Sequence, residues 1–153
     1  MFWFNKKHPN TLYIDNRKTE KGFYNNPGHR VNPDILMDFR DLKLLDKSFK
    51  LVVFDPPHIF CDSKKSAIVQ EYGSLNRINW KDDIKRGFNE CWRVLEDYGI
   101  LIFKWGEISI KRKEILEVIN KEPLFGHPRY SKVKNHWFCF MKIPKQKIEG
   151  KKE

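Results

Sequence analysis

Leu51-Val-Val-Phe-Asp55-Pro-Pro-His58 is the stretch that decides the fold, because an apolar run stops there at an acid and two prolines. Such a run, bounded by turn residues, is typical of a parallel strand that is buried on both faces. In open α/β sheets, ligands bind beyond the carboxyl ends of the strands. The stretch therefore predicts a buried strand followed by a reactive loop.

Three other short apolar runs predict parallel strands, and two of them also end at an acid. They cover Thr11–Asp15, Asp34–Asp38 and Ile100–Lys104. Apolar residues at three- and four-residue steps predict helices over Asn79–Leu95, with Gly99 as a stop, and over Glu107–Asn120. The alternation of strands and helices indicates an α/β fold with a mostly parallel sheet.

The rest of the chain is assigned by composition and by the order of the segments. Pro123–Pro128 predicts a strand or turn, and His136–Lys142 predicts a final, antiparallel strand at the sheet edge, joined to it through the basic loop Arg129–Lys134. Lys18–Pro33, which is polar and rich in glycine and proline, predicts a mobile loop. We expect one domain over residues 1–143 and a basic, disordered tail over 144–153.

Charge and cysteine content limit the partners and the compartment. Lys and Arg number 30 against 20 Asp and Glu in 153 residues, a formal net charge of +10. This excess favours nucleic acid over anionic lipid or acidic protein as a partner. No apolar run reaches the roughly 18 residues of a membrane span, and the N-terminus does not resemble a secretion signal. Three cysteines without a Cys-x-x-Cys pair indicate a reducing, cytoplasmic setting.

The loop Asp55-Pro56-Pro57-His58 has the groups that chemistry on a flat amine requires. The prolines restrict the backbone and aim the Asp55 carboxylate and the loop carbonyls into the crevice. The lone pair of an exocyclic amine is delocalised into its ring, so the amine reacts poorly until acceptors hold its hydrogens. Asp55 and a proline carbonyl are such acceptors, and the planar His58 ring can stack on a flipped base. The alternative is a rigid turn in which Asp55 acts as a cap.

The chain resembles the class I S-adenosyl-L-methionine (SAM)-dependent methyltransferases that methylate amines in DNA, in particular small phage and prophage members with an Asp-Pro-Pro-His loop. The resemblance covers roughly residues 1–142. It is carried, in order, by Met1-Phe-Trp-Phe, Leu12-Tyr-Ile-Asp15-Asn-Arg, Pro33-Asp-Ile through Asp38-Phe39-Arg40, Asp46 to His58, Gly87 to Leu95, Gly99 to Trp105, Pro123-Leu-Phe-Gly126 and His136-Trp137.

The resemblance implies a Rossmann-like sheet that is mostly parallel with an antiparallel C-terminal strand. It implies that Asp15 binds the ribose hydroxyls of SAM and that Asp38 with Phe39 holds the adenine. The carboxyl end of a strand suits a carboxylate that accepts hydrogen bonds from a diol. The alternatives are that Asp15 caps the following segment and that Asp38 pairs with Arg17 or Arg40.

Three further residues are expected around the target base. Lys104 and Trp105 stand at the end of the Ile100 strand, and their place beside the Asp55 loop makes them candidates for lining the base pocket. Tyr72 belongs to the segment Glu71–Arg77, which is expected to cover the site. The alternatives are that Trp105 belongs to the core and that Tyr72 is a packing residue.

One part of the family pattern has no counterpart here. Family members carry, upstream of the Met1-Phe-Trp-Phe stretch, a strand ending in an acid and a small-residue loop that wraps the methionine part of SAM; nothing in Phe2–Asn10 replaces that loop. We therefore expect the first strand to be missing or truncated, with an exposed sheet edge or a groove beside Asp15. The true start lies upstream, the protein is a shortened relative, or another chain supplies the strand. The shortened relative is the favoured explanation.

Three other chemistries are disfavoured. The spacing of His127, His136 and Cys139 matches no common zinc arrangement, so we expect no metal. Methylation at cytosine carbon 5 needs a cysteine nucleophile on the reactive loop, and Cys61 lies beyond His58. The Gly-x-x-x-x-Gly-Lys phosphate loop is absent.

These features predict a SAM-dependent methyltransferase acting on the exocyclic amine of adenine in DNA, with cytosine as a close alternative. The expected partner is DNA, with RNA second; no membrane is expected, and a homodimer is left open. The main alternative is a catalytically impaired module that binds nucleic acid or protein. A methyltransferase of RNA or of a protein glutamine is a third candidate.

Overall fold

The computed structural model describes residues 4–5, 7–22, 28–63, 66–126 and 134–144, and its main feature is a four-stranded sheet. The strand order is β3-β4-β6-β5. The strands are β3 (Phe49–Phe54), β4 (Leu95–Gly106), β5 (Phe125–Gly126) and β6 (Asn135–Met141). β3 and β4 are parallel, and β6 is antiparallel to both of its neighbours, so β5 runs in the direction of β4. The predicted α/β class and mostly parallel sheet are confirmed.

The final strand differs from the prediction in its position. β6 is antiparallel, as expected, but it lies between β4 and β5, so the edge strand is the short β5. The loop predicted to join these two strands falls largely outside the described residues, as does most of the predicted basic tail. The order of the strands along the chain does not predict this position, because β6 comes last in the chain but pairs with the long β4.

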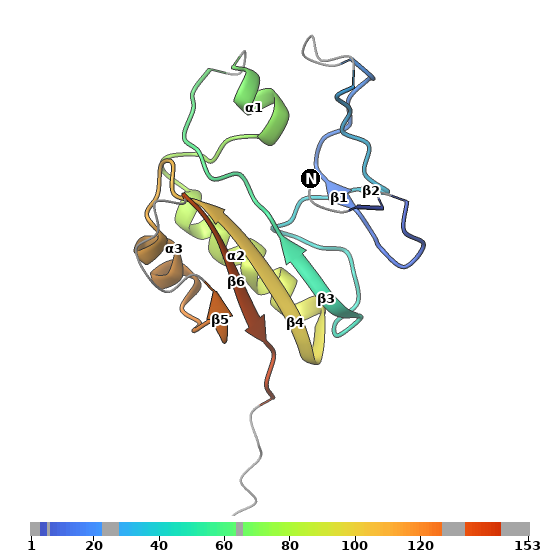
Figure 1. Ribbon diagram of the computed structural model, residues 1–153, viewed down its shortest axis with the longest axis vertical. Coiled ribbons are helices and arrows are strands. Elements are labelled where there is room, and N and C mark those ends of the chain that lie inside the picture. Colours follow the sequence, from blue (N-terminus) through green and yellow to red (C-terminus); the bar gives the residue numbers. More distant parts are fainter. Residues whose placement is uncertain (1–3, 6, 23–27, 64–65, 127–133, 145–153) are drawn as a thin grey trace, which may run out of the picture.

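The first two predicted strands are much shorter than expected and do not join the main sheet. β1 (Ile14–Asp15) and β2 (Ile35–Leu36) pair in parallel in a separate two-stranded sheet. Among the described residues, β3 therefore pairs with β4 alone. Leu51 on β3 is 48% exposed, in contrast to the burial on both faces that its sequence predicts. The two sheets stand apart in Figure 1.

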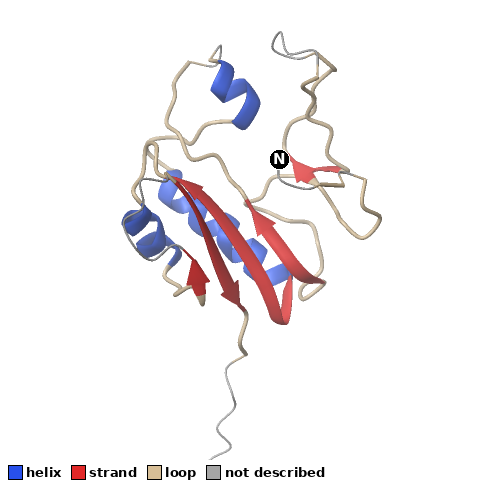
Figure 2. Cartoon of the chain, in the orientation of Figure 1, coloured by secondary structure: helices blue, strands red, loops and turns tan. Residues whose placement is uncertain are grey.

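Helices cover one face of the larger sheet. α2 (Trp80–Val94) lies behind the sheet in Figure 1, and α3 (Arg112–Ile119) lies beside it, as Figure 2 shows by colour. α2 matches its predicted range closely, and Ile84, Phe88 and Cys91 on its apolar face are buried. β4 starts directly after α2, at Leu95, without the loop that Gly99 suggested.

Two helical segments differ from their predictions. α3 begins five residues later than expected, because the Glu107 carboxylate accepts a hydrogen bond from the Arg112 amide and residues 107–111 form a turn before the helix. α1 (Ala67–Tyr72) was not predicted, and it has no buried residue. The loop predicted over Lys18–Pro33 is described in part, and Thr19 and Val31 exchange hydrogen bonds across it.

Phe103 on β4 is at the centre of the core between the sheet and α2. It is fully buried, and its ring centroid lies 5.6 Å from that of Phe54 and 6.0 Å from that of Phe138 on the flanking strands. The ring of Phe88 on α2 meets it edge-on at 6.2 Å. This aromatic stack uses four of the 12 Phe residues, and it holds β3 in register with β4, so the loop after β3 has a rigid support.

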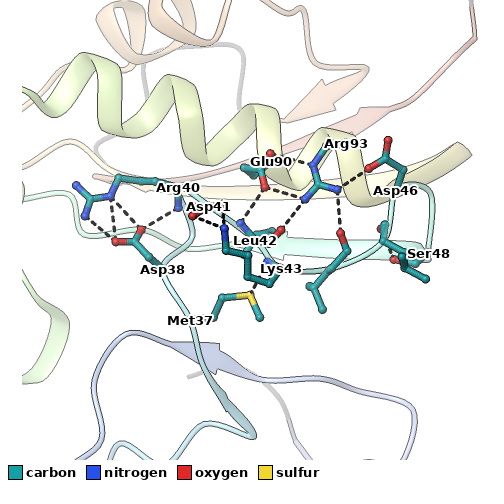
Figure 3. A network of polar contacts seen from close by, with 12 residues as sticks. Met37, Asp38, Arg40, Asp41, Leu42, Lys43, Asp46, Ser48, Glu90 and Arg93 are labelled. Atoms are coloured by element: carbon teal, nitrogen blue, oxygen red, sulfur yellow. Dashed lines mark hydrogen bonds and ion pairs between the residues drawn. The ribbon is translucent and has the colours of Figure 1, made fainter.

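The segment between β2 and β3 is fastened to α2 by Arg93 (Figure 3). Its guanidinium donates to the main-chain carbonyls of Leu42, at 2.7 Å, and Leu44, at 2.9 Å, and to the carboxylates of Glu90 and Asp46. Glu90 in turn accepts the Leu42 amide at 2.8 Å, and Arg93 holds the pKa of Glu90 below its usual range. One side chain therefore satisfies several main-chain groups of a segment that has little regular structure.

Arg93→Met is expected to lower the free energy of unfolding by about 2 kcal/mol, because it leaves part-buried carbonyls and the Glu90 carboxylate without charged donors. Urea denaturation followed by circular dichroism measures the loss. Arg86→Met on the same helix is the control, because Arg86 is exposed and lies 3.8 Å from the Asp82 carboxylate. This substitution is expected to lower the free energy of unfolding by no more than about 0.5 kcal/mol. Equal losses in the two variants would contradict this account.

Candidate functional site

A pocket of ≈ 280 Å³ opens at the carboxyl ends of β3 and β4. Because these strands are parallel, the residues that follow them meet at the same edge of the sheet. The lining residues come from the end of β3, from α1, from β4 and its following turn, and from the start of β6: Asp55, His58, Ile59, Ile68, Tyr72, Lys104, Ile108 and Asn135. The volume is close to the lower end of the roughly 300–1,000 Å³ range of ligand sites.

Asp55 pairs with Lys104, which lies on the neighbouring strand β4. The Lys104 ammonium lies 3.1 Å from each carboxylate oxygen of Asp55, and the two side chains, Lys104 and Asp55, keep 21% and 33% of their surface exposed. A symmetric contact of this kind fixes the plane of the carboxylate and leaves further lone pairs of both oxygens open to a ligand. The sequence predicted that both residues belong to the site, and the structure brings them together.

The His58 ring lies between the pocket, which it lines, and the core residue Trp105. Its ring centroid is 6.1 Å from that of Trp105, in an edge-on arrangement. A Cβ on Gly106 would lie 2.6 Å from the His58 Cδ2 atom, so the ring fits only because position 106 has no side chain. Burial lowers the pKa of His58, the Asp55 charge opposes this shift and the Lys104 charge adds to it. The imidazole is therefore neutral at neutral pH.

The depressed pKa of His58 gives a signed prediction for stability. The unfolded chain takes up a proton at His58 near pH ~6.5, whereas the folded chain does so only at lower pH, so folding is progressively disfavoured as pH falls below ~6.5. We expect the free energy of unfolding to fall between pH ~6.5 and ~5 less steeply in His58→Gln than in the native chain. Urea titrations over this range measure the two slopes. Equal slopes would show that His58 titrates normally.

Asp15, at the end of β1, is held by Arg17. The guanidinium Nε and Nη2 atoms each lie 2.9 Å from one of the two carboxylate oxygens, and the Arg17 amide donates to Oδ1 at 2.9 Å. By accepting the Arg17 amide, the Asp15 carboxylate caps the segment that follows it, as in the alternative stated for this residue. The carboxylate is at a strand end, as predicted, but most of its acceptor positions are engaged within the protein.

Asp38 and Phe39 are both engaged within the fold. Arg40 donates to the Asp38 carboxylate with a shortest distance of 2.6 Å and lowers the pKa of Asp38, and it also pairs with Asp83 on α2. This is the surface pairing that was considered as the alternative for Asp38. Phe39 packs its ring against Gly87 of α2, where a Cβ would lie 2.3 Å from it, and edge-on to Phe54.

Tyr72 and Trp105, both predicted for the base pocket, are placed differently from each other. Tyr72 lines the pocket from α1 and is 52% exposed, and a hydrogen bond with the Glu71 carboxylate raises the pKa of its hydroxyl. Trp105 is fully buried, and its indole N–H donates to the Ile110 carbonyl at 3.1 Å. Trp105 therefore belongs to the core and reaches the site only through its edge contact with His58.

Five other residues near the site were not predicted as part of it. Arg17 was considered only as a partner of Asp38, and Ile59, Ile68, Ile108 and Asn135 carry no motif. Ile108 falls within the range predicted for a helix, Glu107–Asn120, but it precedes α3 and is 57% exposed at the pocket. Their roles depend on which segments the fold brings to this edge.

A second hollow, of ≈ 450 Å³, lies beyond the Asp55 loop and is lined by none of the predicted site residues. It is lined by Cys61, Asp62, Ser74, Leu75, Asn76, Arg77 and Ile78. Within the described ranges, no group of three His, Cys, Asp or Glu side chains could hold a metal ion; His127 lies outside them. In the same part of the chain, no helix has the length and apolar character needed to cross a bilayer.

Two solved structures have a similar arrangement of the chain. No family model and no curated protein matches the sequence. Two crystal structures of a protein of Thermus thermophilus, assigned as a DNA modification methylase, match with TM-scores of 0.44 and 0.45 and 15% and 18% sequence identity. The first was determined with SAM bound. Each alignment covers 76% of this chain and little more than half of the other, 55% and 53%.

Proposed function

We propose that this chain is a SAM-dependent DNA methyltransferase that modifies the exocyclic amine of adenine, with cytosine as the alternative base. The observation that carries this proposal is the convergence of Asp55 and His58 on one pocket at the carboxyl ends of parallel strands. The pocket therefore combines a carboxylate that accepts hydrogen bonds with a planar, neutral ring. Methylation of an aromatic amine requires an acceptor for the amine hydrogens and a flat surface on which its ring can stack.

The residues of the loop have separate roles in this proposal. Asp55 and the Pro57 carbonyl accept hydrogen bonds from the amine and so make its nitrogen a better nucleophile. Pro56, which is buried, and Pro57 hold the loop in shape, and His58 stacks on the flipped base. Lys104 orients Asp55, and Tyr72 lines the pocket from α1.

When bound, SAM supplies the electrophilic methyl group. Asp15 has the chemistry to accept a ribose hydroxyl, because three of its roughly four acceptor positions are used and one is open. Asp38 and Phe39 are proposed for the adenine on the resemblance, and both would have to bind it while keeping their contacts to Arg40 and Gly87.

The proposed polymer partner is DNA, with RNA as the alternative. The net charge of +10 supports a polyanion, and Lys104 places one cation at the pocket itself. Cys61, Cys91 and Cys139 are free thiols, which supports a reducing, cytoplasmic setting. We assign this activity to residues 1–143 and treat residues 144–153 as a separate basic tail.

Transfer of a radiolabelled methyl group from SAM tests the proposal. Single- and double-stranded oligonucleotides that carry adenine alone or cytosine alone as the amine-bearing base distinguish the two targets, and matched RNA distinguishes the polymer. The proposal predicts incorporation into adenine-containing DNA, together with micromolar SAM binding by calorimetry. No incorporation into any nucleic acid at saturating SAM would overturn it.

A second candidate function is a binding module that retains the scaffold without turnover. Its supporting observation is that Asp15, Asp38 and Asp55 each form an ion pair within the protein, with Arg17, Arg40 and Lys104 respectively. Carboxylates held in this way can be purely structural. Salt-sensitive DNA binding with no heat of SAM binding would favour the module over the enzyme.

A further inference from the structure

α1 has little of its own to hold it in place. It has only six residues, well below the roughly 12 needed for a helix to be stable alone, and none of them is buried. Its N-cap residue, Ser66, makes no capping hydrogen bond through its side chain. In the described part of the chain, hydrogen bonds from Arg17 reach α1 at its other end and help to fix its position.

At that end, α1 contacts Arg17 and Pro57. The Arg17 Nη1 atom donates to the carbonyls of Gln70, at 3.2 Å, and Glu71, at 3.4 Å, in the last turn of α1. Gly73, which ends the helix with φ +79°, packs against Pro57: a Cβ there would lie 3.1 Å from the Pro57 ring and 4.0 Å from Arg17. The end of α1 thus rests on the reactive loop and on one guanidinium.

The same guanidinium holds the Asp15 carboxylate through its Nε and Nη2 atoms. Arg17 therefore joins the strand end proposed for the ribose to the helix that walls the amine pocket. Ile68 and Tyr72 lie one helical turn apart on α1, on the face that lines this pocket. A shift at either end of the guanidinium is transmitted to the other.

We propose that Arg17 is a positioning residue that couples occupancy of Asp15 to the placement of α1 and hence to the shape of the Asp55 pocket. The assignment of Asp15 to a ribose rests on the proposed function. A ribose diol offers two O–H donors, whereas Asp15 has one open acceptor position, so binding of both hydroxyls displaces one of the hydrogen bonds that Arg17 makes to Asp15. Where the displaced donor belongs to the guanidinium, the Nη1 atom of the same group loses part of its support, and its hold on α1 weakens.

Hydrogen exchange of the α1 amides, followed by NMR, tests the coupling in the full chain. The Gly73 amide, which bonds to the Val69 carbonyl at 2.8 Å, is a suitable reporter. Without ligand, Arg17→Met is expected to speed its exchange about tenfold, the loss typical of a charged hydrogen bond. Asp15→Asn is expected to act in the same direction, and the double variant should exceed Arg17→Met by less than about twofold, because both changes break one connection.

The ligand arm uses S-adenosylhomocysteine, the demethylated product of SAM. Its addition should speed exchange at Gly73 about threefold in the native chain and leave it unchanged in Arg17→Met. Substitution of a residue that only stabilised the fold would leave this response to the ligand in place. Arg30→Met is the matched control, because Arg30 donates to the exposed Asn32 side chain, and it should retain the native response.

The outcomes separate this inference from the proposed function. Native exchange at Gly73 in unliganded Arg17→Met overturns the coupling, whether or not the ligand binds. Binding of S-adenosylhomocysteine with no change at Gly73 in the native chain also overturns it. A calorimetric titration without heat of binding overturns the proposed function, and fast exchange in the two unliganded variants would then still support the connection through Arg17.

Discussion

Asp55→Ala is expected to lower the rate of methyl transfer about 100- to 1,000-fold, the loss typical of removing one preorganised group from a reacting centre. The variant loses the acceptor that Lys104 holds at 3.1 Å beside the pocket. The Pro57 carbonyl alone would then have to orient the amine, so the loss should appear in kcat with little change in the Kd of SAM. Single-turnover transfer of a radiolabelled methyl group to an adenine-containing duplex measures it.

The control for this variant is Asp62→Ala, on the same loop. Asp62 has 88% of its side chain exposed, and among the described residues it pairs with Arg77 at 3.8 Å, so its removal should leave the rate within about twofold of native. Asp55→Asn keeps one carbonyl acceptor and should retain more activity than Asp55→Ala. If Asp55→Ala, still folded by circular dichroism, methylates at the native rate, Asp55 has no part in the chemistry.

Phe88→Ala is expected to lower the free energy of unfolding by about 3–5 kcal/mol. Phe88 is fully buried on α2, and its ring contacts those of Phe140, at 5.2 Å, Trp92, at 6.0 Å, and Phe103, at 6.2 Å. Removing it leaves a cavity between α2 and the sheet that rigid neighbours cannot fill. Urea denaturation measures the loss.

Phe125→Ala provides the comparison for the same chemical change at the surface. Phe125 lies on the short edge strand β5 and is 68% exposed, so its loss should cost under about 1 kcal/mol. A similar loss in both variants would mean that the aromatic stack around Phe103 is not the centre of the core. A loss below about 1 kcal/mol in Phe88→Ala would mean the same.

Helices and strands with a clear apolar pattern of their own could be predicted from the sequence. α2 carries an apolar stripe through Ile84, Phe88 and Cys91, and the structure buries this stripe. β3 and β4 have apolar runs that end at a loop, and they pair in parallel as expected. These elements depend mainly on local periodicity, which the sequence contains in full.

Segments that depend on neighbours were predicted poorly. The first two predicted strands have two residues each, and within the described ranges each has the other as its sole partner. α1 has no side-chain cap, and its six residues carry one helical pair, Ile68 and Tyr72, which is too short a pattern to predict a helix. β6 lies inside the sheet because the two-residue β5 pairs with its far side, and so short a strand leaves no periodic signal in the sequence.

The candidate site also has residues that a local pattern predicted and residues whose role depends on distant neighbours. Asp55 and His58 were predictable because one loop carries both of them. Lys104 and Trp105 were proposed together for the pocket, yet adjacent residues of a strand point to opposite faces, so only one of the two can line it. Lys104 faces Asp55 and Trp105 faces the core. The part played by Arg17 depends on a contact with residues more than fifty positions away and could not be read from the sequence.

The free side of β3 has a consequence for handling the protein in concentrated solution. Among the described strands it has β4 as its single neighbour, and Leu51 on it is exposed. An unpaired strand flank of this kind is a template on which another molecule can add a strand and begin to aggregate. Lys50, exposed beside Leu51, is the kind of charge that opposes such growth, so raising the salt concentration is expected to promote precipitation by screening it.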